Sequence, residues 1–171
     1  TGGGGSIGSE LCRQIIQLSP KSITILEINE YFLYNLVQEI KEKFRNTNVR
    51  VIPKLVSILD YNILENIFKT TKPNIIFHAA AYKHVPLVEK NPLIGIKNNV
   101  FSTEVICKLA EKHLIRQVIF ISSDKAVRPK SVMGASKRLS EQIINAYSEK
   151  ALMNNKLNDG NPTLFSMVRF G

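Results

Sequence analysis

The strongest constraint on the fold of this chain is the alternation of short apolar runs with longer amphipathic stretches. The short runs have the length and composition of buried strands, and the longer stretches repeat apolar residues at helical spacing. A strand–helix–strand order favours parallel pairing with right-handed crossovers. We expect strands at 23–26, 49–53, 74–80, 117–122 and 163–168, and helices at 7–18, 30–44, 60–69, 92–112 and 133–152. The pattern predicts an α/β fold with a doubly wound parallel sheet and ligands at the carboxyl ends of its strands.

A glycine-rich turn, TGGGGSIG, opens the chain. Gly2, Gly5 and Gly8 are spaced three apart, and a predicted helix follows at once. Glycines let the backbone turn tightly and approach a pyrophosphate, and the helix N-terminus offers unpaired N–H groups to that anion. A predicted strand ends in Glu27, at the spacing of about 20 residues that is typical of a dinucleotide site.

Glu27 indicates which dinucleotide would bind. Its carboxylate can accept both hydroxyls of an adenosine ribose and would repel a 2′-phosphate, so NAD is expected rather than NADP. The alternative is an exposed glutamate at a strand end with no ligand. Glu30 is a second candidate, but it fits better inside the following helix.

The composition bounds the class of protein. Hydrophobic residues make up 44% and charged residues 22% of the chain, as in ordinary globular domains. No apolar run reaches the roughly 18 residues of a membrane helix. Cys12 and Cys107 lie in apolar helical patterns without metal-ligand spacing, so we expect buried reduced thiols and no metal site.

The net charge of +9 raises the question of an anionic partner, such as nucleic acid or a membrane surface. The Lys and Arg residues are spread along the chain, with no dense basic run and no interleaved aromatic stripe. A solvated surface is therefore the favoured explanation, and a phosphate-bearing small substrate is the next. No nucleic-acid partner is expected.

Two further strand ends fit the same site. Ser57 and Ile58 follow the strand at 49–53, where this architecture usually flanks adenine, although Ile58 is equally well explained as a core residue. The small side chains of 79–81 would let a dinucleotide lie close to the backbone. His78 sits on an apolar strand and is expected to be a core histidine without a catalytic role.

The strand at 117–122 leads into the most reactive cluster of the chain. Ser123, Asp124 and Lys125 follow the strand, and Met133 and Lys137 share one face of the next predicted helix. A hydroxyl, a carboxylate and two amines could thus converge on one cleft. The alternative is a capped turn stabilised by an ion pair.

These pieces together resemble the extended short-chain dehydrogenase/reductase superfamily, which has the Rossmann fold. More narrowly, they resemble the bacterial UDP-N-acetylglucosamine 4,6-dehydratases of polysaccharide biosynthesis. The matching segments are TGGGGSIGSELCRQI, HAAAYKHVPLVEKNPLIGIKNNVFST, SSDKAVRPKSVMGASKRLSE and VRFG. Most of the superfamily carries Tyr where this chain has Met133, whereas a membrane-associated branch of the dehydratase group resembles it in carrying Met.

The resemblance implies contacts for individual residues. The cofactor would contact Gly2, Gly5, Ser6, Ile7 and Gly8 at its diphosphate, Glu27 at the adenosine ribose, Ser57 and Ile58 at adenine, Ala79, Ala80 and Ala81 along its length, and Lys137 at the nicotinamide ribose, with Asn99 supporting the site. Lys83 and His84 would lie near the nucleotide sugar. Relatives often carry Gly-Asp at positions 56–57, which weakens the adenine assignment.

The implied reaction removes hydride from C4 of the sugar, eliminates water across C5 and C6, and returns the hydride to C6. Ser123 occupies the catalytic Ser/Thr position, with Lys125 as the C5 base and Asp124 as the C6 acid. For these roles we expect burial and the charge of Lys137 to lower the pKa of Lys125, and desolvation to raise the pKa of Asp124. With Met133 in place of Tyr, the C4 proton would go to Asp124, to Lys125 or to a water held by Ser123.

The expected unit is therefore an NAD-binding Rossmann domain over residues 1–171, a fragment of a longer chain that lacks the first strand and the C-terminal substrate part. A UDP-sugar substrate and a homo-oligomer are implied. The expected location is the cytoplasm, or the cytoplasmic face of the inner membrane if membrane spans precede Thr1. The alternatives are a nucleotide-sugar epimerase acting at C5 or C4, and a non-catalytic NAD(H)-binding sensor. The missing tyrosine favours the sensor, and the Asp124–Lys125 pair argues against it.

Overall fold

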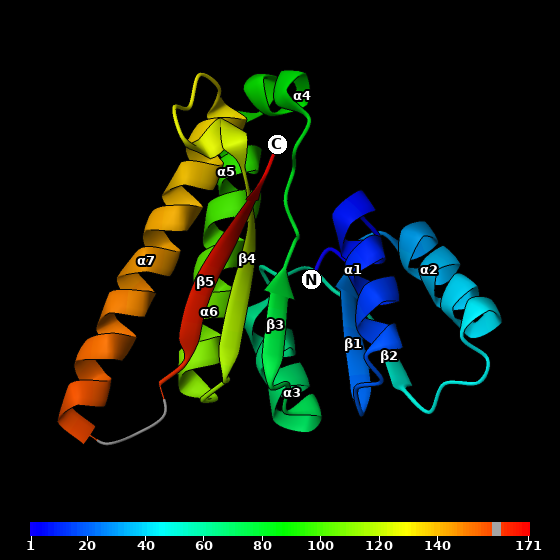
Figure 1. The fold of residues 1–171 in the computed structure, drawn as a ribbon. Coiled ribbons are helices and arrows are strands. Elements are labelled where there is room, and N and C mark those ends of the chain that lie inside the picture. The colour runs from blue at the N-terminus through cyan, green and yellow to red at the C-terminus, as the bar shows by residue number, and fades with distance from the viewer. Residues whose placement is uncertain (159–161) are drawn as a thin grey trace.

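Strands and helices alternate along the chain in the computed structural model, which describes residues 1–158 and 162–171 (Figure 1). The strands are β1 (Ser22–Glu27), β2 (Arg50–Leu55), β3 (Ile75–His78), β4 (Gln117–Ser123) and β5 (Leu164–Phe170). The helices are α1 (Ser6–Gln17), α2 (Glu30–Lys43), α3 (Tyr61–Thr71), α4 (Val85–Lys90), α5 (Pro92–Ile96), α6 (Ser102–Lys112) and α7 (Val132–Asn158). A π-helical turn, η1 (Lys97–Phe101), joins α5 to α6, and a 3-10 turn, η2 (Asp124–Ala126), follows β4.

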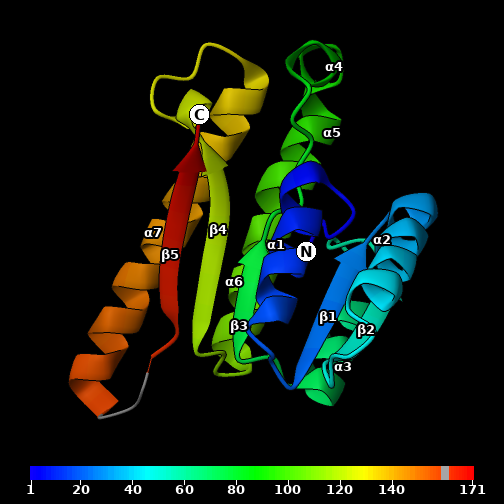
Figure 2. The same cartoon turned by 45° about the vertical axis from the view of Figure 1, so that its right-hand side comes forward.

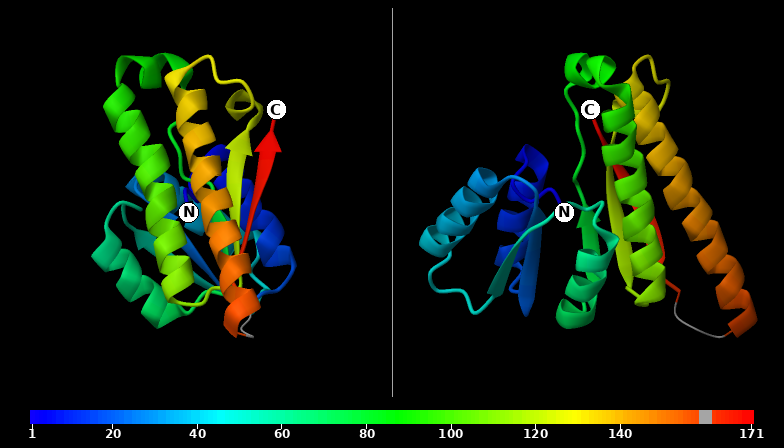
Figure 3. Two further views of the ribbon diagram at one scale, coloured as in Figure 1. Left: turned by 90° about the vertical axis from the view of Figure 1, so that its left-hand side faces the viewer. Right: turned by 180° about the vertical axis from the view of Figure 1, so that it is seen from behind.

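The described strands pair in parallel, as predicted. β1 pairs with β2, and β4 pairs with β3 on one side and β5 on the other. One hydrophobic cluster, with Ile16, Ile25 and Leu36, packs α1 and α2 against β1. A second cluster, with Ile106 and Phe120, joins α3, α6 and α7 to β3, β4 and β5. Helices α6 and α7 lie in front of β4 and β5 in the right-hand view of Figure 3, which is seen from behind, and so cover one face of these strands.

A cavity of about 710 Å³ lies between β1 and β3 and is lined by both strands, including Ile25 and Phe77. Figure 2 shows these two strands facing each other with the N-terminus near their carboxyl ends. The backbone nitrogen of Thr1 donates to the carbonyl oxygen of Phe77 at 2.8 Å, and the N–H of Gly3 donates to the carbonyl oxygen of Leu26 at 3.2 Å. These two bonds hold residues 1–3 between the carboxyl ends of β3 and β1.

Three expectations about local structure were wrong. Pro53 lies inside β2, in register with Ile25, whereas the strand expected over 49–53 would end at this residue. It is tolerated there because β2 pairs only with β1 and is therefore an edge strand among the described residues. The helix expected over 92–112 is divided by η1, and helix α4 was not expected at all. Strand β3 ends at His78, so residues 79–81 form the start of a loop.

Cys12 and Cys107 are buried free thiols, as predicted, and burial raises the pKa of both. Among the described residues, every helix is too short or too polar to span a bilayer.

Candidate functional site

The glycine turn leads directly into the N-terminus of α1. Gly2 has a φ of +64°, in the left-handed region that strains other residues. A Cβ on Gly8 would collide with the carbonyl oxygen of Gly2, so only glycine allows the helix to start this close to the turn. The N-cap, Gly5, provides no side-chain cap, and the first turn, which includes Ser6 and Ile7, holds no acidic residue. No side chain here competes with an anion, which fits the expected diphosphate.

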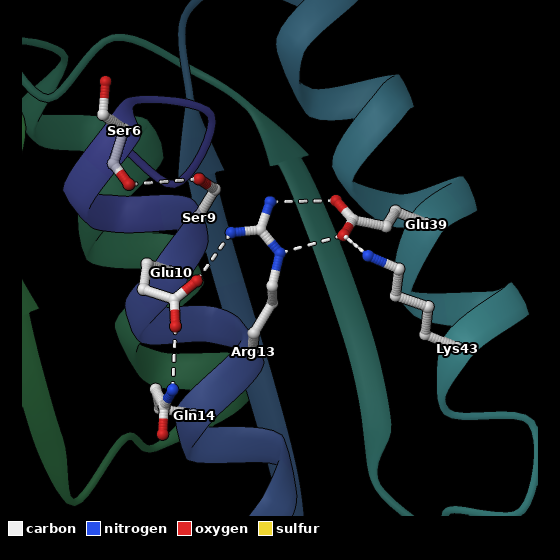
Figure 4. Close-up of polar contacts among 7 residues, drawn as sticks. All are labelled: Ser6, Ser9, Glu10, Arg13, Gln14, Glu39 and Lys43. Atoms are coloured by element: carbon white, nitrogen blue, oxygen red, sulfur yellow. Dashed lines mark hydrogen bonds and ion pairs between the residues drawn. The ribbon is translucent and has the colours of Figure 1, made fainter.

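Arg13 ties α1 to α2 and so fixes the position of this helix N-terminus (Figure 4). Its Nε and Nη2 atoms donate to the two carboxylate oxygens of Glu39 at 2.9 and 3.0 Å, and Nη1 donates to Glu10 at 2.9 Å. Lys43 adds a further bond to Glu39 at 2.7 Å. The hydrogen bonds from Arg13, followed by that from Lys43, lower the pKa of Glu39 to about 2.

Glu27 ends β1, as predicted, but it is buried, with 8% of its surface exposed. Its Oε2 atom accepts the N–H of Gly4 at 2.8 Å, and Oε1 accepts the N–H groups of Ile28 and Asn29 at 2.9 and 3.0 Å. The carboxylate therefore holds the glycine turn against the end of β1. The sequence pattern does not reveal this contact, because the dinucleotide spacing assigns no role to Gly4.

Residues 79–81 support the glycine turn from the other side. A Cβ on Gly2 would collide with the backbone of Ala80, so the two segments are in close contact. The N–H of Ala79 donates to the carbonyl oxygen of Thr1 at 3.2 Å, and that of Ala80 donates to its hydroxyl at 3.3 Å. The close approach requires glycine at position 2 and holds Ala79 and Ala80 against the turn.

His78 is a core histidine, in agreement with the sequence-based expectation. Its ring is fully buried, with Nδ1 at 2.7 Å from the hydroxyl of Thr1 and Nε2 at 3.2 Å from that of Thr103. Burial lowers the pKa of His78 well below its ordinary value. Its hydrogen bonds connect the glycine turn to α6.

Asn99 joins the loop after β3 to α7. Its Oδ1 accepts the N–H of Tyr82 at 2.8 Å, while Nδ2 donates to the carbonyl oxygen of Tyr82 at 3.0 Å and to the hydroxyl of Ser136 at 2.9 Å. The residue is buried and lies on η1, and π-helical turns are frequent at functional sites. This geometry fits the supporting role expected for Asn99.

The remaining residues that were predicted to contact a ligand make fewer hydrogen bonds. Lys83 reaches across to α1, where its Nζ donates to the hydroxyl of Ser6 at 3.3 Å. His84 is the exposed N-cap residue of α4. Ile58 is buried in the second hydrophobic cluster, which fits its interpretation as a core residue. The hydroxyl of Ser57 accepts an N–H within its own turn at 3.3 Å.

Ser123, Asp124 and Lys125 lie together where β4 meets η2. The hydroxyl of Ser123 donates to Oδ1 of Asp124 at 2.9 Å, and Nζ of Lys125 donates to the same oxygen at 3.0 Å. The side chains of Asp124 and Lys125 are 56% and 52% exposed. The hydrogen bond from Lys125, followed by that from Ser123, lowers the pKa of Asp124. The expected upward shift for Asp124 and the expected burial of Lys125 are therefore wrong, because both groups face solvent.

Lys137 is the buried amine of the site, with 6% of its surface exposed. Its Nζ donates to the carbonyl oxygen of Ile121 at 2.8 Å and lies 4.7 Å from the centre of the Phe120 ring. Met133, one turn earlier on α7, is buried as well. Desolvation lowers the pKa of Lys137 to about 8, against a smaller opposing effect of the Glu141 charge.

Glu141 forms a buried charge cluster that sequence reasoning missed. Its carboxylate accepts the hydroxyl of Ser122 at 2.7 Å and two N–H groups of Arg169 at 2.7 and 2.8 Å. Arg138 adds a contact at 3.1 Å. The bonds from Arg169 are the main cause that lowers the pKa of Glu141 to about 2. The only sequence signal is a glutamate one turn after Lys137, since nothing in the sequence pairs it with Arg169.

Comparison with known proteins identifies related chains. A family model described as "polysaccharide biosynthesis protein" matches residues 1–171. The chain is 39% identical over 171 residues to the probable polysaccharide biosynthesis protein EpsC of Bacillus subtilis, a match that covers 100% of this chain and 27% of EpsC. It is 29% identical over 173 residues to a UDP-glucose 4-epimerase of Rickettsia bellii, and covers 47% of that protein. The chain thus spans less than half the length of either curated relative.

A solved structure has the same fold. The dTDP-glucose 4,6-dehydratase DesIV of Streptomyces venezuelae, crystallised as a double mutant with NAD bound, superposes with a TM-score of 0.75 at 19% identity. The match covers 98% of this chain and 53% of DesIV. At this identity the likeness establishes the Rossmann-like fold alone, with helices packed on parallel strands as predicted.

Proposed function

Because the chain belongs to the polysaccharide biosynthesis protein family, we propose that it carries the cofactor site and catalytic residues of an NAD-dependent nucleotide-sugar 4,6-dehydratase. The proposed substrate is UDP-N-acetylglucosamine, and the product is a 4-keto-6-deoxy sugar. The observation that carries the proposal is the hydrogen-bonded pair of Asp124 and Lys125 at the carboxyl end of β4. Elimination of water needs an acid and a base next to each other, and this pair supplies both.

The residues around the glycine turn fit NAD. The uncapped N-terminus of α1 would receive the diphosphate, and Glu27 would receive the adenosine ribose. The three N–H groups that Glu27 already accepts leave a lone pair for a ribose hydroxyl. When bound, the cofactor supplies a reversible hydride acceptor, so the reaction needs no external oxidant.

The sugar itself would activate the acid–base pair. In the structure, the side chains of Lys125 and Asp124 face solvent and share one hydrogen bond. A bound sugar would displace that solvent, and desolvation favours the neutral forms of both groups. Transfer of one proton along the hydrogen bond would create the amine that removes the C5 proton and the acid that protonates the C6 hydroxyl. Ser123 would hold Asp124 in place through its bond at 2.9 Å.

An epimerase is the second candidate, because a relative at 29% identity is named UDP-glucose 4-epimerase. Epimerisation at C4 needs hydride transfer but no elimination, and so leaves the Asp124–Lys125 pair without a role. A non-catalytic NAD(H) sensor, suggested by Met133, has the same weakness.

The products distinguish these candidates. The full-length protein is incubated with UDP-N-acetylglucosamine and NAD, and the sugar is analysed by mass spectrometry and NMR. Loss of one water supports the dehydratase, inverted stereochemistry at unchanged mass supports an epimerase, and unchanged sugar with bound cofactor supports the sensor. Asp124→Asn and Lys125→Ala should abolish the loss of water, whereas Lys130→Ala, on the exposed loop that follows η2, should not.

A further inference from the structure

Oxidation at C4 releases a proton from the C4 hydroxyl, and Met133 occupies the position from which a tyrosine would take it. We propose that Lys137 accepts this proton directly as a neutral amine, an inference that rests on the dehydratase function proposed above. The O–H bond breaks and the proton binds the lone pair of Nζ, while the bound cofactor would supply the acceptor for the hydride at C4. Lys137 would then be a catalytic residue in addition to its expected contact with the nicotinamide ribose.

The surroundings of Lys137 favour a neutral amine. Nζ has one hydrogen-bond acceptor among the described residues, the carbonyl oxygen of Ile121. Met133, buried one turn earlier, offers no hydroxyl to an ammonium group, whereas a tyrosine could. A buried amine with few polar partners loses its proton more readily than one in water.

The charged groups near Lys137 are matched with one another and leave it without a counter-ion. Glu141, one turn later on α7, is held by Arg169 from β5 and by Arg138. His78 on β3 is buried and neutral, and it brings no negative charge. Asp124 and Lys125 on η2 form an ion pair with each other. Lys137 is thus a desolvated amine beside a carboxylate whose charge other residues balance.

The other candidate acceptors already have tasks. Asp124 accepts hydrogen bonds from Ser123 and Lys125 and must keep a proton for the C6 hydroxyl. Lys125 must be free to take the C5 proton. The hydroxyl of Ser123 donates to Asp124 and would need a further acceptor to remove a proton. A separate base is therefore needed for the C4 proton, and the buried amine of Lys137 can provide it.

The proton count closes with this assignment. Lys137 gains the C4 proton, and Lys125 takes a proton from C5 and returns one to C5 after elimination. Asp124 gives one proton to the C6 hydroxyl, which leaves as water. One turnover leaves Lys137 with one proton more and the Asp124–Lys125 pair with one fewer, and exchange with solvent restores both.

The first test separates the two roles of Lys137 with Lys137→Arg in the full-length protein. A guanidinium can donate to a ribose hydroxyl but cannot accept a proton near neutral pH. We expect NAD affinity within about tenfold of wild type and dehydration at least about 100-fold slower. Lys130→Arg is the matched control. Dehydration at the wild-type rate by Lys137→Arg overturns the inference and leaves the dehydratase intact, whereas a wild-type protein that removes no water overturns the proposed function.

The second test needs no turnover. The pH dependence of acetylation of Lys137 by acetic anhydride, read by peptide mass spectrometry, gives the protonation curve of this amine in the folded protein. We expect a midpoint near pH 8, well below the ordinary lysine value of about 10.4. The pre-steady-state rate of C4 oxidation should rise with pH through the same midpoint. An ordinary lysine midpoint for Lys137 overturns the inference even if the protein is a dehydratase.

Discussion

Arg169 holds Glu141 with two parallel hydrogen bonds of 2.7 and 2.8 Å, from the end of β5 to the middle of α7. The glutamate is fully buried, and its carboxylate also accepts the hydroxyl of Ser122 on β4. One side chain thus connects two strands and a helix at the end of β4, where the residues proposed for catalysis lie. Bidentate arginine–carboxylate pairs fix the orientation of the two side chains as well as balancing their charges. This contact therefore aligns the ends of β4 and β5.

Replacing Arg169 by Met should therefore destabilise the protein, because the buried carboxylate of Glu141 would lose its main partner. Arg138→Met, which removes a single contact at 3.1 Å, is the control and should cost less. Urea denaturation of both variants measures the effect. Equal midpoints for Arg169→Met and wild type would contradict this account of the cluster.

The Glu141–Arg169 pair should also affect the free energy of unfolding in acid. Since the folded pKa of Glu141 is about 2 and the ordinary value is about 4.3, the pair contributes its full stability above the ordinary value. That contribution is lost as the pH falls towards 2. The free energy of unfolding should therefore fall less between pH 5 and about pH 2.5 in Arg169→Met than in wild type. A parallel fall in the two proteins would count against the assignment.

Lys137→Met should stabilise the protein near neutral pH while removing activity. The folded pKa of Lys137 is about 8, so below that pH the folded protein must charge a buried amine that is charged without cost in the unfolded chain. Stability of the wild type should thus rise between pH 8 and about pH 10, where only the unfolded chain still binds this proton. We expect Lys137→Met to be about 1–3 kcal/mol more stable than wild type at pH 7 and closer to it at pH 10. Urea denaturation at the two pH values tests this, and a destabilised variant at pH 7 would be the contrary result.

Glu27→Ala should weaken NAD binding by about tenfold or more, because it removes a ribose acceptor and releases the N–H of Gly4 that the carboxylate holds. The preference for NAD over NADP should narrow, since a 2′-phosphate would no longer meet a carboxylate. Glu30→Ala, at the exposed start of α2, is the matched control and should bind both cofactors like wild type. Calorimetric titration with each dinucleotide gives the answer. An unchanged NAD affinity in Glu27→Ala would place the ribose elsewhere.

The sequence predicted strands and helices where hydrophobic periodicity was strong. The five strands and the helices α1, α2, α3, α6 and α7 follow from apolar spacing, and Glu27 was placed correctly at the end of β1. The π-helical turn at Asn99 could not be foreseen, because its cause is tertiary: the Asn99 side chain bonds to Tyr82 and Ser136, distant in sequence. Pro53 was misplaced because an edge strand tolerates a proline that a central strand would exclude.

The electrostatics of the candidate site differ from the sequence-based expectation. Burial was expected at Lys125 and is found at Lys137, while the catalytic roles of Asp124, Lys125 and Lys137 stay predictions. Burial depends on where β4 ends and how α7 packs against it, which residue spacing does not specify. The Glu141–Arg169 pair was missed for a related reason, since 28 positions separate two residues that only the β4–β5 pairing brings together.

The central claim is that Asp124 and Lys125 carry out an elimination across C5 and C6, and solvent isotope incorporation tests it most directly. The full-length protein is supplied with UDP-N-acetylglucosamine in D₂O, and the product is examined by mass spectrometry and NMR. We expect a sugar that has lost one water and carries one deuterium at C5, and we expect neither change with Asp124→Asn or Lys125→Ala. A sugar altered at C4 with no deuterium at C5 would contradict it.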